Sequence, residues 1–447
     1  MAPLSTFAVA AAIGGPVWHF QSAEIRRDAV ITLLTLTAIL LVLISWGRTA
    51  WWSLRIARYY PLKRQSRPAD SAEKQPHVAV LLPLRGADPL LDDCLQGLCL
   101  QDYPSFEIRV ILDSEEDSAW GSVRQAMSRF PNIAWHPVVL TNRLETCSLK
   151  CSALLQGIQS LDANTELVAV IDADVSAPVW WISELVGPFS DPTVGAVSGM
   201  RWFLPTRNNC GSIVRRTWGA AASAQMFSLD VLWGGTLAYR ASLLRDPELQ
   251  QVWSRSFVED TSVVAFLRRR GARVVTVPGL SMVNTETISL SGCYRFIRRQ
   301  TFSVLRYHPA RYQLMLTCIG LVISAVATGV IVPLTLAAGQ TISAMTLLVL
   351  TLSTIALTVL PLMYIEMCLH LNASKDRPIP GLTLMQLPMI PVTVVLYFVA
   401  LFSALRMREI DWRGIHYDIR RDGSVRRRNY RPWTANPSSH NVSDSII

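Results

Sequence analysis

The feature that most constrains the fold of this chain is a set of four long apolar stretches placed around a globular middle. The first stretch, residues 29–46, has no charged side chain over 18 positions, which is long enough to cross the hydrocarbon core of a bilayer. Three more stretches follow near the C-terminus, at about 314–338, 342–369 and 384–405. The first stretch is too long for a cleavable signal peptide, and no small-residue cleavage pattern follows it. We therefore expect an integral membrane protein.

Basic residues next to the first apolar stretch predict its orientation. Six of them follow it: Arg48, Arg55, Arg58, Lys63, Arg64 and Arg67. Because cytoplasmic flanks of membrane helices are enriched in Lys and Arg, we expect the middle of the chain in the cytoplasm, at a bacterial inner membrane. The residues before the stretch are apolar but are interrupted by Gly14, Gly15 and Pro16, which predicts an extracytoplasmic or interfacial segment.

The basic C-terminal tail conflicts with a simple count of crossings. Three full crossings after a cytoplasmic middle would place the tail outside, against the enrichment of basic residues on the inner side. Pro388 and Pro391 in the last apolar stretch indicate that one segment is re-entrant or interfacial. We therefore expect a cytoplasmic tail.

These patterns divide the chain into seven segments. They are an N-terminal extracytoplasmic or interfacial segment (1–28), a transmembrane helix (29–50), a basic linker (51–75), a cytosolic domain (76–293), an amphipathic interfacial helix (294–312), C-terminal membrane helices (313–405) and a basic tail (406–447).

The net charge of +9 comes mainly from basic residues beside the apolar stretches and in the tail. That distribution indicates membrane topology and contact with anionic lipid headgroups. Nucleic acid is not an expected partner, since no module of stacking aromatic residues accompanies the charge.

The globular middle alternates strand patterns with helix patterns. Continuous apolar runs predict buried strands near 77–84, 106–112, 133–139 and 167–171, and helical spacing predicts helices at 90–100, 118–130 and 149–161. Alternation of this kind implies a mostly parallel sheet with helical crossovers. In such sheets, ligands bind at the carboxyl ends of the strands.

Acidic residues follow two of these strands and begin a later helix. Asp113 follows one strand, and Asp172 and Asp174 follow another. Two carboxylates one residue apart can hold Mg²⁺ or Mn²⁺ against a diphosphate, although solvated loop acids would give the same pattern. Glu259 and Asp260 precede a helix, where acids are also favoured by the helix dipole.

The order of these motifs resembles family 2 glycosyltransferases, most closely the ceramide glucosyltransferase group. The likeness covers most of the chain after its first thirty or so residues, up to the final tail. It is carried by motifs that begin at Pro83 (PLRGADP), Gln101 (QDYP), Asp113 (DSEED), Asp172 (DAD), Val194 (VGAVSG), Trp233 (WGGT), Phe257 (FVED), Arg295 (RFIR) and Asp411 (DWRGIHY).

The resemblance implies a fold and an activity. The fold is α/β, a GT-A-like nucleotide-sugar-binding domain with a mostly parallel sheet, an N-terminal transmembrane helix and a C-terminal helical membrane bundle. The activity is that of an inverting, metal-dependent hexosyltransferase, which moves glucose from UDP-glucose to the hydroxyl of a membrane lipid such as ceramide. The expected partners are a UDP-sugar donor, a lipid acceptor and the bilayer.

The resemblance also assigns roles to single residues. Asp260 is the expected general base, and Glu259 shapes the site. Asp172 and Asp174 are the expected metal ligands. The expected substrate-binding residues are Asp113 at the uracil or ribose, Lys150 near the nucleotide, Trp233, Gly234, and the diphosphate clamp Arg295 and Arg298. For Lys150 a solvated helix lysine is the equal alternative.

One residue departs from the family pattern. Arg299 stands where the family has a tryptophan after the arginine pair. The aromatic wall near the acceptor is then expected from Tyr307, Trp202 or Trp218, or is absent.

A lipid acceptor would explain apolar stretches on both sides of the globular middle. In the segment 294–312, arginines alternate with Phe296, Ile297 and Phe302, which predicts a helix at the membrane surface with its apolar side chains among acyl chains. An ordinary amphipathic surface helix is the alternative.

Other functions remain open at this stage. A processive polysaccharide synthase uses the same acids and arginines, but usually with more membrane helices and a Gln-x-x-Arg-Trp element. A membrane-tethered binding or scaffold protein with a degenerate transferase domain is a third hypothesis. The sugar, and the choice among ceramide, diacylglycerol and a hopanoid or polyprenyl lipid, are not decided by the sequence.

Overall fold

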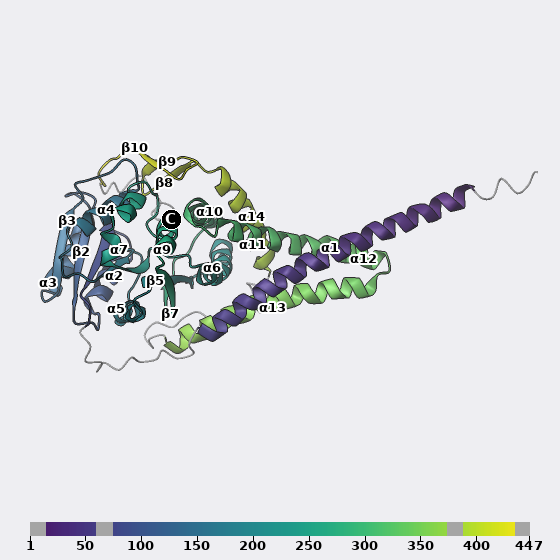
Figure 1. The fold of residues 1–447 in the computed structure, drawn as a ribbon, viewed down its shortest axis with the longest axis horizontal. Helices are drawn as coiled ribbons and strands as arrows, with labels where there is room; N and C mark the ends of the chain where they lie inside the picture. Colours follow the sequence, from purple (N-terminus) through teal and green to yellow (C-terminus); the bar gives the residue numbers. More distant parts are fainter. Residues whose placement is uncertain (1–14, 60–74, 373–387, 434–447) are drawn as a thin grey trace, which may run out of the picture. The chain divides into compact units, whose positions relative to one another are not determined.

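The structure is a computed structural model, and it describes residues 15–59, 75–372 and 388–433 of the 447-residue chain (Figure 1). Its contacts divide the chain into two compact units. The helical unit comprises Met1–Ser53 and Ile319–Leu360, and the sheet unit comprises Leu54–Cys318 and Pro361–Ile447.

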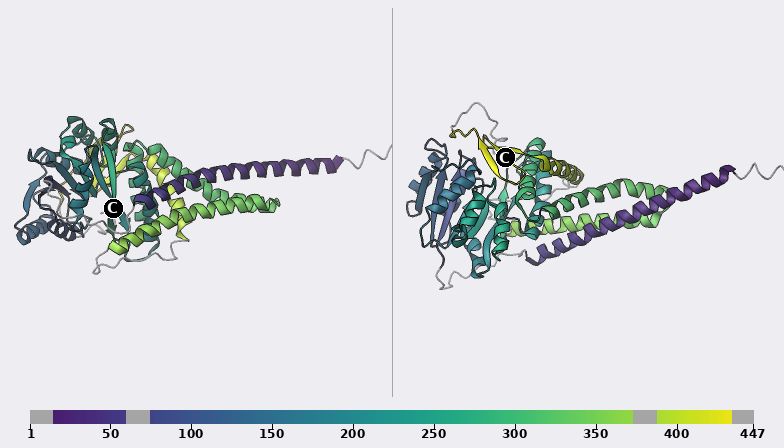
Figure 2. Two further views of the ribbon diagram at one scale, coloured as in Figure 1. Left: turned by 60° about the horizontal axis from the view of Figure 1, so that its bottom comes forward. Right: turned by 45° about the horizontal axis from the view of Figure 1, so that its top comes forward.

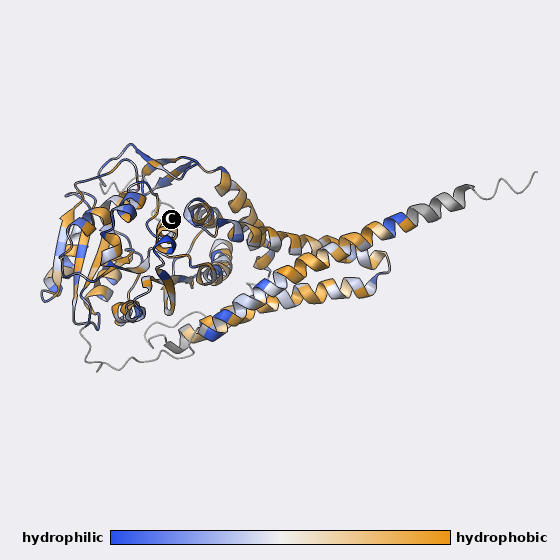
Figure 3. Cartoon of the chain, viewed as in Figure 1, coloured by the Kyte–Doolittle hydropathy of each residue, from blue (hydrophilic) through white to orange (hydrophobic). Residues whose placement is uncertain are grey.

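Long apolar helices make up the helical unit. They are α1 (Gly15–Tyr59), α11 (Arg311–Val326) with a π-helical segment (Ala327–Ile331) and α12 (Val332–Ala337), and α13 (Thr341–Asn372), several of which continue into the sheet unit. Val42, Ala327 and Leu347 form a small buried core, and the Thr35 and Thr335 hydroxyls lie 3.0 Å apart. Most outward side chains are apolar, as the orange colouring of these helices shows (Figure 3).

Four helices among the described residues are long and apolar enough to cross a membrane: Ile25–Arg55, Arg311–Ala337, Thr341–Cys368 and Met389–Arg406. The predicted apolar N-terminal and C-terminal helices are therefore confirmed as candidate spans. The helix α1 is longer than the predicted 29–50, because Pro16 lies in its first turn, where a proline is tolerated, instead of breaking it.

Parts of the predicted segments lie outside the described residues. These are residues 1–14 of the N-terminal segment, 60–74 of the linker, 373–387 before the last apolar helix and 434–447 of the tail. Residues 51–59 of the predicted linker continue the helix α1.

A seven-stranded sheet forms the centre of the sheet unit (Figure 2). Its strands are β1 (Val78–Leu84), β2 (Phe106–Leu112), β3 (Ala134–Val139), β4 (Leu167–Ile171), β5 (Val194–Phe203), β6 (Thr236–Arg240) and β7 (Arg273–Asn284). They lie in the order β3-β2-β1-β4-β6-β5-β7.

The sheet is mostly parallel, as the sequence predicts. Four of its six neighbouring pairs are parallel, and only β6 runs against both of its neighbours. The central strands β1 and β4 are covered on both faces, which explains why they are continuously apolar.

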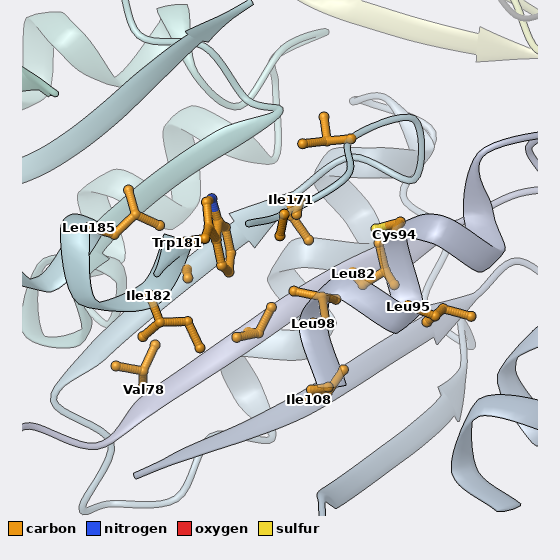
Figure 4. Close-up of a cluster of buried hydrophobic side chains, with 14 of the residues drawn as sticks. Val78, Leu82, Cys94, Leu95, Leu98, Ile108, Ile171, Trp181, Ile182 and Leu185 are labelled. Atoms are coloured by element: carbon orange, nitrogen blue, oxygen red, sulfur yellow. The ribbon is translucent and has the colours of Figure 1, made fainter. Parts of the chain in front are cut away.

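Helices cover both faces of the sheet. They are α2 (Leu91–Cys99), α3 (Trp120–Arg129), α4 (Leu149–Gln159), α5 (Trp181–Val186), α6 (Cys210–Leu229), α7 (Ala241–Leu244), α8 (Pro247–Trp253), α9 (Val264–Arg269) and α10 (Leu290–Tyr307), with 3₁₀ turns at Gly187–Ser190 and Thr261–Val263. One core lies between the sheet and α2, α3 and α5, where Trp181, Leu98 and Ile171 are fully or almost fully buried (Figure 4). The other core lies under α4, α8 and α9.

The helix α10 packs inside the protein, against α6 and α14 (Met389–Arg406). The ring of Phe296 meets Phe203 edge-to-face at 5.5 Å and Trp218 at 5.8 Å between centroids. Phe296, Ile297 and Phe302 are at most 5% exposed. Protein helices therefore cover this face of α10, and the position of the helix at a membrane surface stays a prediction.

A small antiparallel sheet follows α14 and packs onto the sheet unit. Its strands are β8 (Glu409–Trp412), β9 (Ile415–Ile419) and β10 (Val425–Arg428), in the order β10-β9-β8. The Arg427 amide donates to the Glu145 carbonyl at 2.7 Å, and the rings of Tyr417 and Phe257 are 5.2 Å apart. We therefore expect these three strands on the same side of a membrane as the seven-stranded sheet.

Candidate active site

A cavity of about 270 Å³ opens at the carboxyl ends of the central strands. One end is polar and lined by Asp113, Lys150, Asp172, Asp174, Glu259 and Asp260. Apolar side chains from the helices line another part, which we call the apolar end: Trp218, Ala222, Met226, Phe296, Leu314 and Tyr397, with Arg215 and Gln225 of α6 also in the cavity wall. The polar end contains every acidic residue to which the sequence assigns a role in the site.

The sheet topology brings the strand-end acids together. Strand β1 pairs with β2 on one side and with β4 on the other, so the residues after β2 and β4 reach the same edge. Asp113 follows β2, and Asp172 and Asp174 follow β4. This convergence at the carboxyl edge is the usual place for a ligand in an open α/β sheet.

Lys150 connects two of the acids. The helix α4 begins after Ser148, whose hydroxyl accepts from the Cys151 amide, and this cap fixes the first turn that carries Lys150. The Lys150 Nζ lies 2.5 Å from Asp172 Oδ1 and 2.5 Å from Glu259 Oε1. Burial disfavours the ammonium, but the two carboxylates outweigh it and raise the pKa of Lys150, so it remains charged.

The two acids that flank Lys150 respond differently. Burial would raise the pKa of the Asp172 carboxyl, but Lys150 and Arg201 outweigh it and hold that pKa below its usual value. Burial raises the pKa of Glu259 to about 7, and the repulsion from Asp260 and Asp172 adds to it against the attraction of Lys150. Glu259 is therefore the acid of this site that titrates near neutral pH.

Arg201 is a site residue that the sequence does not single out. Its Nη2 lies 2.9 Å from Asp174 Oδ2, and its guanidinium stacks 4.8 Å from the Trp233 ring centroid. Burial, with repulsion from Asp172 and Asp88, still raises the pKa of Asp174 despite Arg201. The signal in the sequence is an arginine near the end of the otherwise apolar strand β5.

Asp260 is the N-cap residue of the short 3₁₀ helix Thr261–Val263. Its Oδ1 accepts from the Thr261 amide and, at 2.7 Å, from the Thr261 hydroxyl, while its Oδ2 accepts from the Gly234 amide at 2.9 Å. Both predicted features, a capping acid and an acid facing the cavity, are thus present together. The remaining lone pairs of the carboxylate are free to accept a proton from a hydroxyl.

Gly234 has to be a glycine because of Glu259. A Cβ added at Gly234 would lie 1.9 Å from Glu259 Oε1 and 3.0 Å from Lys150 Nζ. The chain before it is fixed by Ser198, whose hydroxyl accepts from the Trp233 amide at 2.9 Å. The predicted residues Trp233 and Gly234 both line the cavity.

Asp113 is nearly buried at the same edge, with 2% of its side chain exposed. It forms an ion pair with Arg85, and its backbone carbonyl accepts from Arg143. The Arg143 Nε lies 3.9 Å from Asp113 Oδ1, and Tyr430 and Trp433 of the C-terminal tail donate to the same carboxylate.

On α10, the arginine that faces the cavity is Arg299. Arg295 is exposed and Arg298 half-buried, and neither lines the cavity wall, whereas Arg299 and Gln300 do. Arg299 lies about 100° around the helix from Arg298, so it points to a different side. Of the neighbouring residues Arg295, Arg298 and Arg299, only Arg299 therefore lies in the cavity wall with the acids, and the sequence singles out the other two.

Arg299 has no hydrogen bond or ion pair from its guanidinium to any residue in the described ranges, and its Nε is buried. Burial, with repulsion from Arg201, lowers the pKa of Arg299 to about 10 despite Asp172 and Asp174. An uncompensated guanidinium in a cavity wall is a binding group for an anion.

Among the residues considered for an aromatic wall, only Trp218 faces the cavity. Tyr307 is half-buried and does not line the cavity, and its hydroxyl accepts from the Phe257 amide and donates to the Gly423 carbonyl. Trp202 is 1% exposed and belongs to another buried cluster. Other aromatic residues also line the cavity: Tyr397 and Trp412 from the C-terminal elements, and Phe203, Trp233, Phe257 and Phe296.

The carboxylates of Asp172 and Asp174 fit a divalent cation in their chemistry, because Mg²⁺ and Mn²⁺ prefer hard oxygen ligands. Within residues 15–59, 75–372 and 388–433, no group of three or more His, Cys, Asp or Glu side chains could hold a metal by itself. A cation here would take its remaining ligands from a bound diphosphate and water, an arrangement common for Mg²⁺.

Comparison with known proteins identifies relatives of the chain. The model of glycosyl transferase family 21 matches residues 33–425. A ceramide glucosyltransferase of Komagataella phaffii is 38% identical over 56 residues, which cover 12% of this chain and 11% of that protein. A ceramide glucosyltransferase of Gibberella zeae is 25% identical over 144 residues, which cover 29% and 26%.

A beta-monoglucosyldiacylglycerol synthase of Synechocystis is 23% identical over 194 residues, which cover 40% of this chain and 39% of that protein. The chain thus spans between about a tenth and two fifths of the length of these three curated relatives. Among solved structures, the mannosyltransferase PcManGT from Pyrobaculum calidifontis in complex with GDP-Man and Mn²⁺ aligns with a TM-score of 0.44 and 20% identity, covering 74% of this chain and 98% of that one.

Proposed function

The chain belongs to glycosyl transferase family 21, and we propose that it transfers a hexose from a nucleoside diphosphate sugar to the hydroxyl of a membrane lipid. The resemblance to the ceramide glucosyltransferase group is confirmed, and the family whose model matches is number 21, whereas the motifs indicate family 2. The membership of the chain in a glycosyltransferase family and its GT-A-like fold are confirmed with it.

The observation that carries the proposal is the two-ended cavity. Its polar end gathers acids and basic groups at the carboxyl edge of the sheet, and its apolar end runs between α6, α10 and α14. An acceptor that places a hydroxyl among carboxylates and its hydrocarbon among apolar helices is an amphiphile. The apolar helices that flank the sheet unit in the sequence are consistent with a lipid acceptor that stays in a membrane.

The polar end suits a nucleoside diphosphate sugar, with UDP-glucose as the proposed donor. Lys150, Arg201 and Arg299 supply three cationic groups around the acids. We assign the diphosphate to these three residues, and the nucleoside to Asp113, whose carboxylate can accept from uracil N–H or ribose hydroxyls. Arg295 and Arg298, which do not line the cavity, are then not assigned to the diphosphate.

Asp172 and Asp174 are the residues that would hold Mg²⁺ or Mn²⁺ beside the diphosphate. When bound, the cation supplies positive charge that stabilises the departing diphosphate. Lys150 and Arg201, which contact these carboxylates in the structure, orient the two acids for this role.

The chain's own residues supply the rest of the reaction. Asp260 accepts the proton of the acceptor hydroxyl, and its position is held by the Gly234 and Thr261 amides. The acceptor oxygen then attacks the anomeric carbon from the side opposite the diphosphate, so the configuration inverts. Arg299 and Arg201 stabilise the negative charge that grows on the leaving group. Glu259 positions Lys150 through their ion pair, and its carboxylate packs against Gly234.

Membranes that contain the protein, incubated with radiolabelled UDP-glucose, test the proposal. We expect label in organic-extractable lipid. Label in insoluble polymer would instead indicate a polysaccharide synthase, and label in neither fraction would contradict sugar transfer.

The variant Asp260→Asn keeps the shape of the side chain but removes the base. It should lower transfer at least a hundredfold, while UDP-glucose still binds. Asp92→Asn, an exposed acid in the first turn of α2, is the matched control and should transfer at the normal rate. Normal transfer by Asp260→Asn would rule out its role as base.

A further inference from the structure

The carboxylate of Asp113 is already satisfied by the chain's own C-terminal tail. The Tyr430 hydroxyl donates to Asp113 Oδ1 at 3.1 Å, and the Trp433 amide donates to Asp113 Oδ2 at 3.2 Å. Arg85 donates to the same Oδ2. With these three donors in place, only 2% of the Asp113 side chain is exposed, so a ligand that takes both carboxylate oxygens has to displace donors that are already bound.

The tail segment lies over the neighbouring backbone as well. The indole of Trp433 rests on Gly86, where an added Cβ would lie 2.5 Å from Trp433 Cε2. The guanidinium of Arg85 lies 5.8 Å from the Tyr430 ring and 5.5 Å from the Trp433 ring, and its Nη2 donates to the Arg431 carbonyl at 3.0 Å. These contacts fill the space around Asp113 with two aromatic rings.

From this geometry we infer that residues 430–433 form a latch, a segment that occupies the nucleoside position and that the donor must displace before Asp113 can bind it. The inference rests on the proposed function, because it takes Asp113 as the nucleoside-binding acid. The Tyr430 hydroxyl and the Trp433 amide present O–H and N–H donors to Asp113. A nucleoside offers the same kinds of donor groups through its ribose hydroxyls and base N–H.

The latch is held by a few weak contacts and is partly exposed, so a ligand can displace it. It follows β10 through Asn429, whose φ of 49° turns the chain from the small sheet toward Asp113. Arg431 and Pro432 are exposed, and Tyr430 and Trp433 are only half-buried. Hydrogen bonds and cation–π contacts hold the segment, each worth on the order of 1 kcal/mol, so a ligand that replaces them can open it.

The latch also selects among ligands. A ligand with a nucleoside competes with it for Asp113, whereas a bare diphosphate uses Lys150, Arg201 and Arg299 and does not need Asp113. When a site is open for only a fraction of the time, the apparent affinity falls by that fraction. The latch should therefore weaken the binding of UDP and leave that of inorganic pyrophosphate unchanged.

Calorimetric titration of the purified full-length protein with UDP and with pyrophosphate provides the test. We expect a chain that ends at Asn429 to bind UDP about tenfold more tightly than the full chain, and pyrophosphate within about twofold of it. Tyr430→Phe in the full-length chain keeps the ring and removes one donor to Asp113, so UDP should bind about threefold more tightly. Tyr312→Phe, an exposed tyrosine away from the cavity wall, should change neither affinity.

The outcomes separate the latch from the donor site. Equal UDP affinities in all four chains would refute the latch but leave the donor site intact. Weaker UDP binding after truncation would show the tail to be part of the nucleoside site and would also refute the latch. An equal gain in pyrophosphate affinity after truncation would refute the claim that residues 430–433 occupy the nucleoside position. Failure of every chain to bind UDP would overturn the donor site and the latch together.

Discussion

At the scale of single residues, the site depends on a chain of charges through Lys150. Asp172, Lys150 and Glu259 are joined by two contacts of 2.5 Å, and Asp260 follows Glu259 directly. Removal of one member leaves a buried charge without its partner, which is costly. Because Glu259 titrates near neutral pH and Lys150 does not, the charge of this group changes within the physiological range.

Donor binding should therefore weaken as the pH rises. Burial and neighbouring acids raise the pKa of Glu259 to about 7, so Glu259 is neutral at pH 6 and negative at pH 8. The new negative charge lies beside Lys150 and opposes the donor diphosphate. We expect the Kd for UDP-glucose to rise roughly tenfold between pH 6 and pH 8.

The variant Glu259→Gln cannot ionise and should give a Kd that is nearly constant over this range. Calorimetric titration at several pH values measures both proteins. A wild-type Kd that falls with rising pH, or an equal rise in Glu259→Gln, would contradict the assignment.

Gly234 is the residue whose size matters most. In Gly234→Ala the new Cβ would meet Glu259 Oε1 at 1.9 Å, so the loop or the acid has to move. We expect the free energy of unfolding to fall by about 1–3 kcal/mol and transfer activity to be lost. Thermal unfolding and the radiolabel assay measure the two effects.

Gly121→Ala, in the helix α3, is the matched control. Its added Cβ meets nothing within 4 Å, and alanine favours a helix over glycine, so it should be neutral or slightly stabilising. Equal behaviour of the two variants would contradict the close packing at Gly234.

At the scale of elements, the helix α10 places its arginines differently with respect to the cavity. Arg299 lines the cavity, whereas Arg295, one turn nearer the start of the helix, is exposed and does not line it. We expect Arg299→Ala to raise the KM for UDP-glucose at least tenfold, since it removes a charged contact to the diphosphate. Arg295→Ala should change it less than about twofold. A larger effect for Arg295→Ala in steady-state kinetics would restore the original assignment of the clamp.

The sequence predicts the elements around the site better than the contacts between them. The buried strands and the helices between them appear where their apolar patterns place them, so Asp113, Asp172 and Asp174 could be expected at one edge. The reversed strand β6 has the same apolar pattern as its neighbours, so its direction is not readable. The orientation of the Arg299 side chain toward the cavity depends on how α10 packs against α6 and α14. The local sequence pattern does not encode this packing.

Contacts between residues far apart in the chain also cannot be predicted from local sequence patterns. Arg201 pairs with Asp174 because β5 joins the sheet next to β6 and β7. Tyr430 reaches Asp113 across more than three hundred residues, through a small sheet that has only weak strand signals.

At the scale of the whole molecule, the small sheet bears on the number of membrane crossings. The strands β8, β9 and β10 pack with the seven-stranded sheet in one unit, so we expect an even number of crossings between the two sheets. The candidate spans α11–α12 and α13 would supply two. One face of α14 packs on α6 and α10, and its other face exposes Val392, Val395 and Val399. We therefore expect α14 to lie at the membrane surface without crossing.

Cysteine labelling of membrane vesicles tests this topology in a Cys210→Ser background, which removes the exposed native thiol. Arg421→Cys in the tail and Asn164→Cys in the sheet unit are both at exposed positions. An impermeant maleimide should label both from the same side. Labelling of the two from opposite sides would show that α14 crosses.

The central claim is that one cavity brings a sugar donor at its polar end to a lipid at its apolar end. Ala222 lines the apolar end on α6, a helix that carries none of the site acids, and Ala222→Phe would fill that space. The most direct measurement compares purified wild type and Ala222→Phe in lipid nanodiscs, for UDP affinity and for transfer of labelled glucose to lipid. We expect UDP binding within about twofold of wild type and at least tenfold less labelled lipid for Ala222→Phe. Unchanged transfer to lipid by Ala222→Phe would contradict it.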